Sequence, residues 1–244
     1  MNQLSFEFDS TPVWAKRLAV FDTETTGLDL RESRIVTACL VELDEQGQIV
    51  SDRAEWLADP GIEIPEMAAR VHGYTTERAR DEGEPAGKVV SEIVDRLGEL
   101  FSAGTPVVAY NASYDFSLLH HDALRNSIEP LSLPRPIIDP LVIDKKIDTF
   151  RKGSRTLQAA CDVYGVSLDG AHDSSVDAIA AGRVFQAIQE KFADSPELNL
   201  TPLQLHDAQI EWARLQAESF AKYLESKGET SRRAGSGVWP VYKK

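Results

Sequence analysis

The sequence predicts an α/β fold in which an antiparallel hairpin forms part of a mixed sheet and helices pack against that sheet. Its first part contains three β-rich runs, and its later part alternates short apolar runs with segments of helical spacing. Strands followed by such an alternation are typical of α/β layer structures. With 244 residues and 42% hydrophobic side chains, the chain can bury one sizeable core. We therefore expect one domain with extensions.

The first predicted elements are strands. KRLAVFD is a short apolar run that ends at Asp22, as a buried strand would. IVTACLVELDEQGQIVSDRAEWLA predicts two further strands joined as a hairpin, with Gly47 in the turn. PEMAARVHGYTTERA predicts a short helix, a break at Gly73 and a second helix that begins at Thr75 or Thr76.

The later elements alternate between helix and strand. PAGKVVSEIVDRLGELF has apolar residues at helical spacing, PVVAY predicts a fourth strand, and SYDFSLLHHDALRNS predicts a helix behind it. RPIIDP predicts a short fifth strand before LVIDKKIDTF, and SSVDAIAAGRVFQAIQEKF predicts a closing helix. A long helix with a broad apolar stripe is expected from about Pro202 to Gly228. The domain itself, a dimer or a partner groove should cover this stripe.

The formal net charge of −13 argues against a protein that coats nucleic acid, since such proteins neutralise many phosphates with Lys and Arg. Carboxylates that hold divalent cations are an exception, because the cations accept a phosphate. One basic run, opposed only by Asp148, is either a track for a nucleic-acid backbone or a solvated helix–loop face. Its members are Lys145, Lys146, Arg151, Lys152 and Arg155.

The two cysteines, Cys39 and Cys161, are too few for a disulfide framework and show no CxxC spacing. They fit a reducing compartment and argue against a zinc knuckle. The first residues lack the basic and apolar regions of a signal peptide, and no window approaches the roughly 20 apolar residues of a membrane span. We therefore expect a cytoplasmic protein without a membrane partner.

Acidic residues recur in three motifs that are far apart in the sequence. Asp22 and Glu24 in FDTETTG are separated by one residue, so in an extended strand both project from the same face. Asp115 lies in YNASYDFSLL, and His172 and Asp177 lie in GAHDSSVDA. Carboxylate oxygens suit a hard ion such as Mg²⁺. Brought together by a fold, these residues indicate a two-metal phosphodiester hydrolase.

Each motif also has a purely structural explanation. A strand that runs into a Thr-Thr-Gly turn accounts for the first two acids. Asp115 fits the first turn of a helix, where an acid gains about 0.3–1 kcal/mol from the helix dipole. Ser174-x-x-Asp177 fits a capping box, and His172 fits a surface loop. The coincidence of all three motifs with the spacings of one mechanism favours the catalytic interpretation.

The motifs resemble the signature of the DEDD superfamily of 3′–5′ exonucleases, histidine subgroup, which includes the proofreading epsilon subunit of bacterial DNA polymerase III and stand-alone relatives. The matching spacings are Asp22-x-Glu24, Asn111-x3-Asp115 and His172-x4-Asp177. The resemblance covers roughly residues 16–192. It implies a ribonuclease-H-like fold with a mixed five-stranded sheet flanked by helices.

We expect four segments on this basis. They are an N-terminal extension over residues 1–15, an exonuclease domain over 16–194, a C-terminal helix over 198–228, and a basic tail over 229–244. The Gly/Ser-broken composition of the tail predicts mobility, although Trp239 and Tyr242 are possible anchors.

By resemblance, catalysis uses two divalent ions, Mg²⁺ or Mn²⁺, which stabilise the attacking and leaving oxygens of an in-line displacement. Asp22 bridges the two ions, Glu24 and Asp177 complete the first site, and Asp115 supports the second. His172 is the general base that takes the proton from the attacking water, because imidazole exchanges protons near neutral pH. A 5′-mononucleotide leaves.

The resemblance also assigns contacts to the terminal nucleotide. Thr25 meets it through a backbone amide, and Leu28 meets it as an apolar wedge. Val71, His72 and Tyr114 pack against its sugar and base, with core packing as the alternative for Val71 and Tyr114.

Two neighbouring residues complete this set. Asn111 either contacts the substrate or caps the helix that carries Asp115. Tyr110 departs from the histidine often found before that asparagine, a change that affects local substrate packing and leaves the metal ligands intact.

We expect a single-stranded DNA 3′ end as the substrate, in proofreading or repair. RNA or short oligoribonucleotides are the close alternative, because no residue visibly reads the 2′-hydroxyl. FDTET also suggests phosphoaspartate transfer, but that chemistry needs an Asp where Glu24 stands and leaves His172 and Asp177 unused. A non-catalytic nucleic-acid-binding or polymerase-docking module is the third class, and a full set of mutually repelling carboxylates argues against it.

The N-terminal segment Gln3–Phe8, QLSFEF, resembles the short peptides that dock bacterial replication proteins on the sliding clamp, with Phe6 where Leu is usual. An extra edge strand is the alternative. The sequence leaves open whether the chain is a polymerase subunit or a stand-alone enzyme, and which oligomer it forms.

Overall fold

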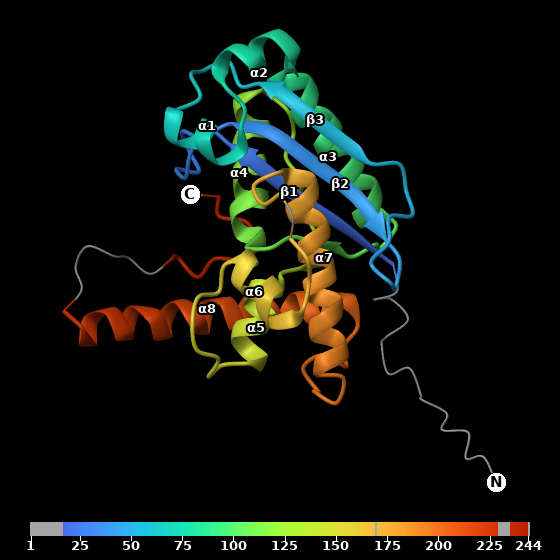
Figure 1. Cartoon of the computed structure of the whole chain (residues 1–244), viewed down its shortest axis with the longest axis vertical. Helices are drawn as coiled ribbons and strands as arrows, with labels where there is room; N and C mark the ends of the chain where they lie inside the picture. The colour runs from blue at the N-terminus through green and yellow to red at the C-terminus, as the bar shows by residue number, and fades with distance from the viewer. Residues whose placement is uncertain (1–16, 169, 229–234, 244) are drawn as a thin grey trace.

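The computed structural model describes residues 17–168, 170–228 and 235–243. Figure 1 shows a sheet with helices packed around it and a long helix, α8, that lies beside one end of the sheet. The segment Gln3–Phe8 lies outside the described residues, so the clamp-binding and edge-strand interpretations both stay predictions.

The sheet has six strands in the order β4-β3-β2-β1-β5-β6. β1 pairs antiparallel with β2 and parallel with β5, β2 pairs antiparallel with β3, and the short outer strands β4 and β6 pair parallel with β3 and β5. The strand bounds are β1 Leu18–Thr25, β2 Ile35–Leu43, β3 Ala54–Asp59, β4 Glu84–Pro85, β5 Val107–Val108 and β6 Ile137–Ile138. The predicted mixed α/β sheet is confirmed, and β4 adds a sixth strand of only two residues.

The described residues form eight helices. Their bounds are α1 Glu66–His72, α2 Thr76–Glu82, α3 Ala86–Ser102, α4 Ala112–Arg125, α5 Pro140–Ile147, α6 Leu157–Tyr164, α7 Ser174–Lys191 and α8 Pro202–Ser226. The predicted helix break at Gly73 and the predicted start of the second helix are confirmed. Gly73 ends α1 with a φ of 81°, and the Thr75 side chain caps α2. Among these helices, none combines the length and apolar character that crossing a membrane requires.

β1 separates two apolar cores, since its side chains alternate between the two faces of the sheet. Phe21 belongs to the core covered by α3 and α4, whereas Val20 belongs to the core beneath α7. α7 approaches the sheet most closely at Gly182, where an added Cβ would lie 2.5 Å from Val20 Cγ1. The same alternation directs Asp22 and Glu24 toward the α7 face.

α8 packs on the domain beside β6. The Gln209 side chain accepts a hydrogen bond from Asp139 N (2.7 Å) and donates one to Ile137 O (3.0 Å). The domain thus covers one side of the predicted apolar stripe, whereas Leu215 and Tyr223 remain exposed.

Residues 235–243 of the tail lie against the domain. Trp239 is buried, and its Nε1–H donates to Asp139 Oδ2 at 3.3 Å. Tyr242 N donates to Ser117 Oγ at 2.7 Å. Trp239 and Tyr242 therefore anchor this part of the tail, which is packed on the domain where the composition predicted a mobile segment.

Candidate active site

The carboxyl half of β1 has an open edge. β5 pairs with β1 only at Ala19 and Val20, so backbone N–H groups further along β1 need other partners. Asp115, in the first turn of α4, fills this place. Its Oδ1 accepts hydrogen bonds from Thr23 N (3.2 Å) and from the Thr23 hydroxyl (2.7 Å). The sequence-based prediction did not include Thr23, although its position between Asp22 and Glu24 could have indicated a role in the site.

The start of α4 is held by a second acid. Asn111 is the N-cap residue with a φ of 63°, but its side chain makes no cap hydrogen bond. Asp139, which follows β6, accepts from Asn111 N (3.0 Å) and Ala112 N (2.9 Å) instead. The side-chain cap considered for Asn111 is therefore wrong, and Asn111 is exposed. The sequence-based prediction also missed Asp139. Its position between a strand and a proline at the start of a helix could have indicated its role.

α7 carries Asp177 in its first turn, and the preceding loop carries His172. Asp173 is the N-cap, and its carboxylate accepts from two backbone N–H groups of α7. The capping box considered for Ser174 and Asp177 is therefore wrong, because the neighbouring acid occupies the cap. Asp177 instead uses Oδ2 to accept from His172 N at 3.2 Å, which ties the loop to the helix.

Glu24, His172 and Asp177 form the tightest group of the site. One ligand atom of each lies within 4.8 Å of those of the other two. Asp177 Oδ1 is buried and has no hydrogen-bond partner among the described residues. A buried carboxylate oxygen without a partner is costly, and a cation would satisfy it. The donor set therefore fits the divalent metal that the resemblance implies.

All four carboxyl groups of the site have raised pKa values. Burial, followed by the charges of Asp115 and Glu24, raises the pKa of Asp22 well above its usual range. Burial and the charge of Asp177 raise the pKa of Glu24 to about 8. Burial raises the pKa of Asp115 to about 7 against the opposing Thr23 hydrogen bond, and burial also raises that of Asp177. Cations bind favourably beside carboxylates that raise one another's pKa in this way.

Thr25 and Tyr114 shape the turn that follows β1. Their hydroxyl oxygens lie 2.7 Å apart, and each is within hydrogen-bonding reach of the Gly27 carbonyl oxygen. Burial raises the pKa of Tyr114 to about 12, so its phenol keeps its proton near neutral pH. The contact of both residues with the terminal nucleotide stays a prediction.

The other predicted substrate residues differ in exposure. Leu28 is 88% exposed and Val71 is 51% exposed, so core packing does not explain Val71. His72 is buried; its Nδ1 accepts from Tyr74 N at 3.2 Å, and its Nε2 has no partner in the described part of the chain. Burial lowers the pKa of His72, which keeps the ring neutral.

The basic run does not form a continuous phosphate track. Asp144 is fully buried, and its Oδ2 pairs with Arg151 Nη2 (2.8 Å) and Arg155 Nη1 (2.7 Å). Tyr164 donates to its other oxygen at 2.6 Å. The sequence-based prediction counted only Asp148 against the basic run and overlooked Asp144. Both arginines pair with Asp144 because a buried carboxylate needs partners.

A family model described as exonuclease matches residues 19–185, which is more than half of the chain. The chain belongs to this exonuclease family. The resemblance to DEDD exonucleases is thereby confirmed, and the matched region of this family member contains all five signature residues.

Two relatives are bacterial DNA polymerase III proteins by name. This chain is 26% identical over 174 residues to the DNA polymerase III PolC-type of Lacticaseibacillus paracasei; the match covers 71% of this chain and 11% of that protein. It is 26% identical over 178 residues to a DNA polymerase III subunit epsilon-like protein of Rhodobacter capsulatus, covering 72% of this chain and 24% of that protein. The chain thus spans about a tenth to a quarter of the length of these relatives.

Solved structures share the fold. E. coli Exonuclease I in complex with a dA16 oligonucleotide matches with a TM-score of 0.63 and 17% identity, over 82% of this chain and 44% of that chain. A 3′-exonuclease that recognises the 3′ end of a histone mRNA stem-loop matches with a TM-score of 0.59 and 15% identity, over 73% of this chain and 83% of that chain. These likenesses support the ribonuclease-H-like fold class.

Proposed function

We propose that the chain is a metal-dependent 3′–5′ exonuclease that removes 5′-mononucleotides from single-stranded DNA ends. The observation that carries the proposal is the grouping of Glu24, His172 and Asp177, with one ligand atom of each within 4.8 Å of the others, beside Asp115, which Thr23 holds against β1. Grouping like charges in this way costs stability, so a functional reason is favoured over a structural one.

Each residue has a definite task in this reaction. Asp22, Glu24, Asp115 and Asp177 would hold two divalent cations, Mg²⁺ or Mn²⁺, which when bound stabilise charge on the attacking and leaving oxygens. His172 is exposed on its loop and would accept the proton of the attacking water.

Neighbouring residues orient the reacting groups. Thr23 fixes one oxygen of Asp115, and the His172 N–H fixes one oxygen of Asp177. We assign the terminal nucleotide to the surface formed by Thr25, Leu28, Val71, His72 and Tyr114. Leu28 and Val71 are exposed, so this surface offers apolar contact, and the buried His72 ring lies beneath it next to the Thr25 backbone.

DNA is favoured as the substrate because relatives are DNA polymerase III proteins and structural neighbours include Exonuclease I with bound oligonucleotides. These relatives also favour a place in proofreading or repair. RNA is the second candidate, since the 3′-exonuclease that recognises a histone mRNA stem-loop has the same fold over most of its length.

The test is a side-by-side digestion of 5′-labelled DNA, RNA and mispaired duplex ends with Mg²⁺ or Mn²⁺. We expect stepwise shortening from the 3′ end, fastest on single-stranded DNA, and complete arrest by EDTA. Asp22→Ala should abolish shortening, and His172→Ala should slow it while metal binding persists. Absence of shortening on every substrate with either metal would contradict the proposal, and full activity of His172→Ala would contradict the base assignment.

A further inference from the structure

A groove of about 790 Å³ opens beside the N-terminal end of α4, between α5, α8 and residues 235–239. Figure 1 shows α8 next to α5, with the C-terminal segment returning along α4. Asn111 and Ser113 line the groove, and Asp115 of the candidate active site follows in the first turn of the same helix. The groove and the candidate active site thus adjoin the same end of α4.

Cations and exposed rings share the lining. Lys145 is half-buried, and burial lowers its pKa against the charges of Asp139 and Asp144, neither of which lies within ion-pair distance of it. Lys146 Nζ lies 5.7 Å from the centroid of the Trp212 ring and 3.7 Å from Glu197 Oε1. On α8, the rings of Phe220 and Tyr223 are nearly parallel, with centroids 6.3 Å apart, and Tyr223 is 53% exposed.

The groove lining contains a single carboxylate, although Glu197 and buried Asp144 pair with two of its cations, Lys146 and Arg155. Asp139 is the one acid among the described lining residues, and it is buried. Its oxygens accept hydrogen bonds from the backbone N–H groups of Asn111, Ala112 and Leu141 and from Trp239 Nε1. Three cations, Lys145, Lys146 and Arg155, thus line the groove against one buried acid, on a chain whose formal net charge is −13.

We propose that this groove binds the nucleic-acid strand on the 5′ side of the nucleotide being removed. Lys145 neutralises a backbone phosphate, and the half-exposed ring of Tyr223, with Lys227 Nζ 5.9 Å from its centroid, contacts a base. Single strands are held by this combination of cations and aromatic rings, which tolerates any base sequence. The inference rests on the proposed function, because the strand in the groove is the continuation of the substrate in the active site.

The test measures binding of a 5′-labelled DNA strand, long enough to reach from the active site across the groove, by fluorescence anisotropy in EDTA. The full chain is compared with Lys145→Gln and Tyr223→Ala, after thermal melting shows that each variant is folded. We expect each change to weaken binding by about fivefold or more. Lys145→Gln should also lower the slope of log affinity against log salt by about 0.7, the value for one phosphate on a single strand.

Lys152→Gln is the matched control, since Lys152 belongs to the same basic run but does not line the groove. It should leave the affinity unchanged. Wild-type affinity in both groove variants, or an equal loss in the control, would overturn the proposal, and a protein segment would then be the remaining occupant. Because the assay contains no metal, its outcome is separate from hydrolysis: a strand that binds the groove but is never shortened with Mg²⁺ or Mn²⁺ contradicts the proposed function alone.

Discussion

At the scale of single residues, the site depends on hydrogen bonds that place acids next to one another. Thr23 uses both its N–H and its hydroxyl on one oxygen of Asp115, at the point where β5 no longer pairs with β1. Such bonds to a carboxylate contribute about 1.5–3 kcal/mol each, which offsets part of the cost of burying it. The site is therefore positioned by polar contacts within a buried environment.

Thr23→Val tests this positioning. The substitution keeps the shape of the side chain but removes the donor to Asp115, so we expect the free energy of unfolding to fall by about 1–2 kcal/mol and turnover to fall about tenfold. Thr37→Val is the matched control, because the Thr37 hydroxyl is buried on β2 without a partner among the described residues. Urea denaturation and single-turnover digestion measure both effects. Equal behaviour of the two variants would show that the Thr23 bond is dispensable.

Glu24 predicts a pH dependence of stability in metal-free protein. Its pKa is raised from 4.5 to about 8 by burial and by Asp177, so the folded state retains a proton that the unfolded state loses. Between those two pH values the folded state binds more protons, and the free energy of unfolding falls as pH rises. In EDTA, the free energy of unfolding should therefore fall across this pH window by at least about 1 kcal/mol less in Glu24→Gln than in the wild-type protein, the equivalent of one pKa unit.

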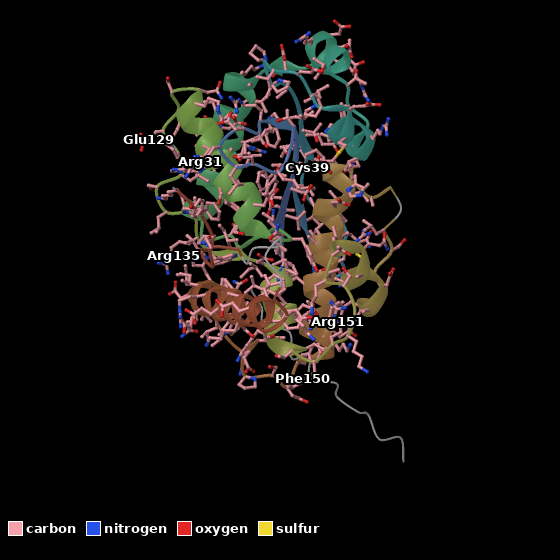
Figure 2. The ribbon with its side chains drawn as sticks, turned by 90° about the vertical axis from the view of Figure 1, so that its left-hand side faces the viewer. Arg31, Cys39, Glu129, Arg135, Phe150 and Arg151 are labelled. Atoms are coloured by element: carbon pink, nitrogen blue, oxygen red, sulfur yellow. The ribbon has the colours of Figure 1, made fainter. Side chains whose placement is uncertain are left out.

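Urea denaturation at the two ends of the pH window measures the difference. Glu129→Gln serves as the control, because Glu129 is exposed and lies at the left-hand edge of the view in Figure 2. If Glu24→Gln keeps the wild-type dependence on pH, the raised pKa of Glu24 is not a feature of the folded protein.

The residues with local signals were predictable, and those with distant partners were not. Asp22 and Glu24 are recognisable from their spacing on a strand. The partner of Thr23 is 92 residues away, and that of Asn111 N is 28 residues away, so only the fold reveals them. The same reason explains why the ion pairs of Asp144 were missed, since its buried position is a property of the folded chain.

At the scale of elements, α7 must lie close to β1 for Asp177 to reach Glu24. Gly182 permits this approach, because a side chain there would overlap Val20 and Leu43. Strand and helix types were predictable from periodicity and caps. β4 was not, since two residues beside β3 carry no periodicity of their own and exist as a strand only through pairing.

Gly182→Ala and Gly98→Ala form a matched pair of helix-interior changes. Alanine favours a helix by about 1 kcal/mol over glycine, so Gly98→Ala should stabilise, as its Cβ would meet only Leu131 Cδ2 at 3.9 Å. Gly182→Ala should destabilise by about 1–3 kcal/mol, because the added Cβ would lie 2.5 Å from Val20 Cγ1 and 2.7 Å from Leu43 Cδ1. Urea denaturation measures both. Stabilisation by both changes would contradict the close packing of α7.

At the scale of the whole molecule, the C-terminal region completes the catalytic domain. Trp239 donates to Asp139, which holds the start of the helix that carries Asp115, and the centroid of its ring lies 4.9 Å from that of His206 on α8.

Phe150 and Arg151, at the lower end of Figure 2, are adjacent in the chain but differ in their surroundings. Phe150 is 94% exposed, whereas Arg151 is paired with buried Asp144.

Trp239→Phe tests the link between the tail and α4. The ring remains, but the donor to Asp139 is lost, so we expect a decrease of about 1 kcal/mol in the free energy of unfolding. The amides of Asn111 and Ala112 should exchange hydrogen faster, because their acceptor is held less firmly. Val238→Ala is the control and should change stability by less than about 0.5 kcal/mol. Unchanged amide exchange in Trp239→Phe would contradict the link.

We propose that Asp22, Glu24, Asp115, Asp177 and His172 form a site that hydrolyses the 3′-terminal phosphodiester with water. Digestion of single-stranded DNA with Mg²⁺ or Mn²⁺ in ¹⁸O-labelled water, followed by mass spectrometry, tests it most directly. We predict that the first product is the 3′-terminal residue as a 5′-mononucleotide with one ¹⁸O in its phosphate. Label in the shortened strand, release of oligonucleotides, or absence of any product would contradict the account.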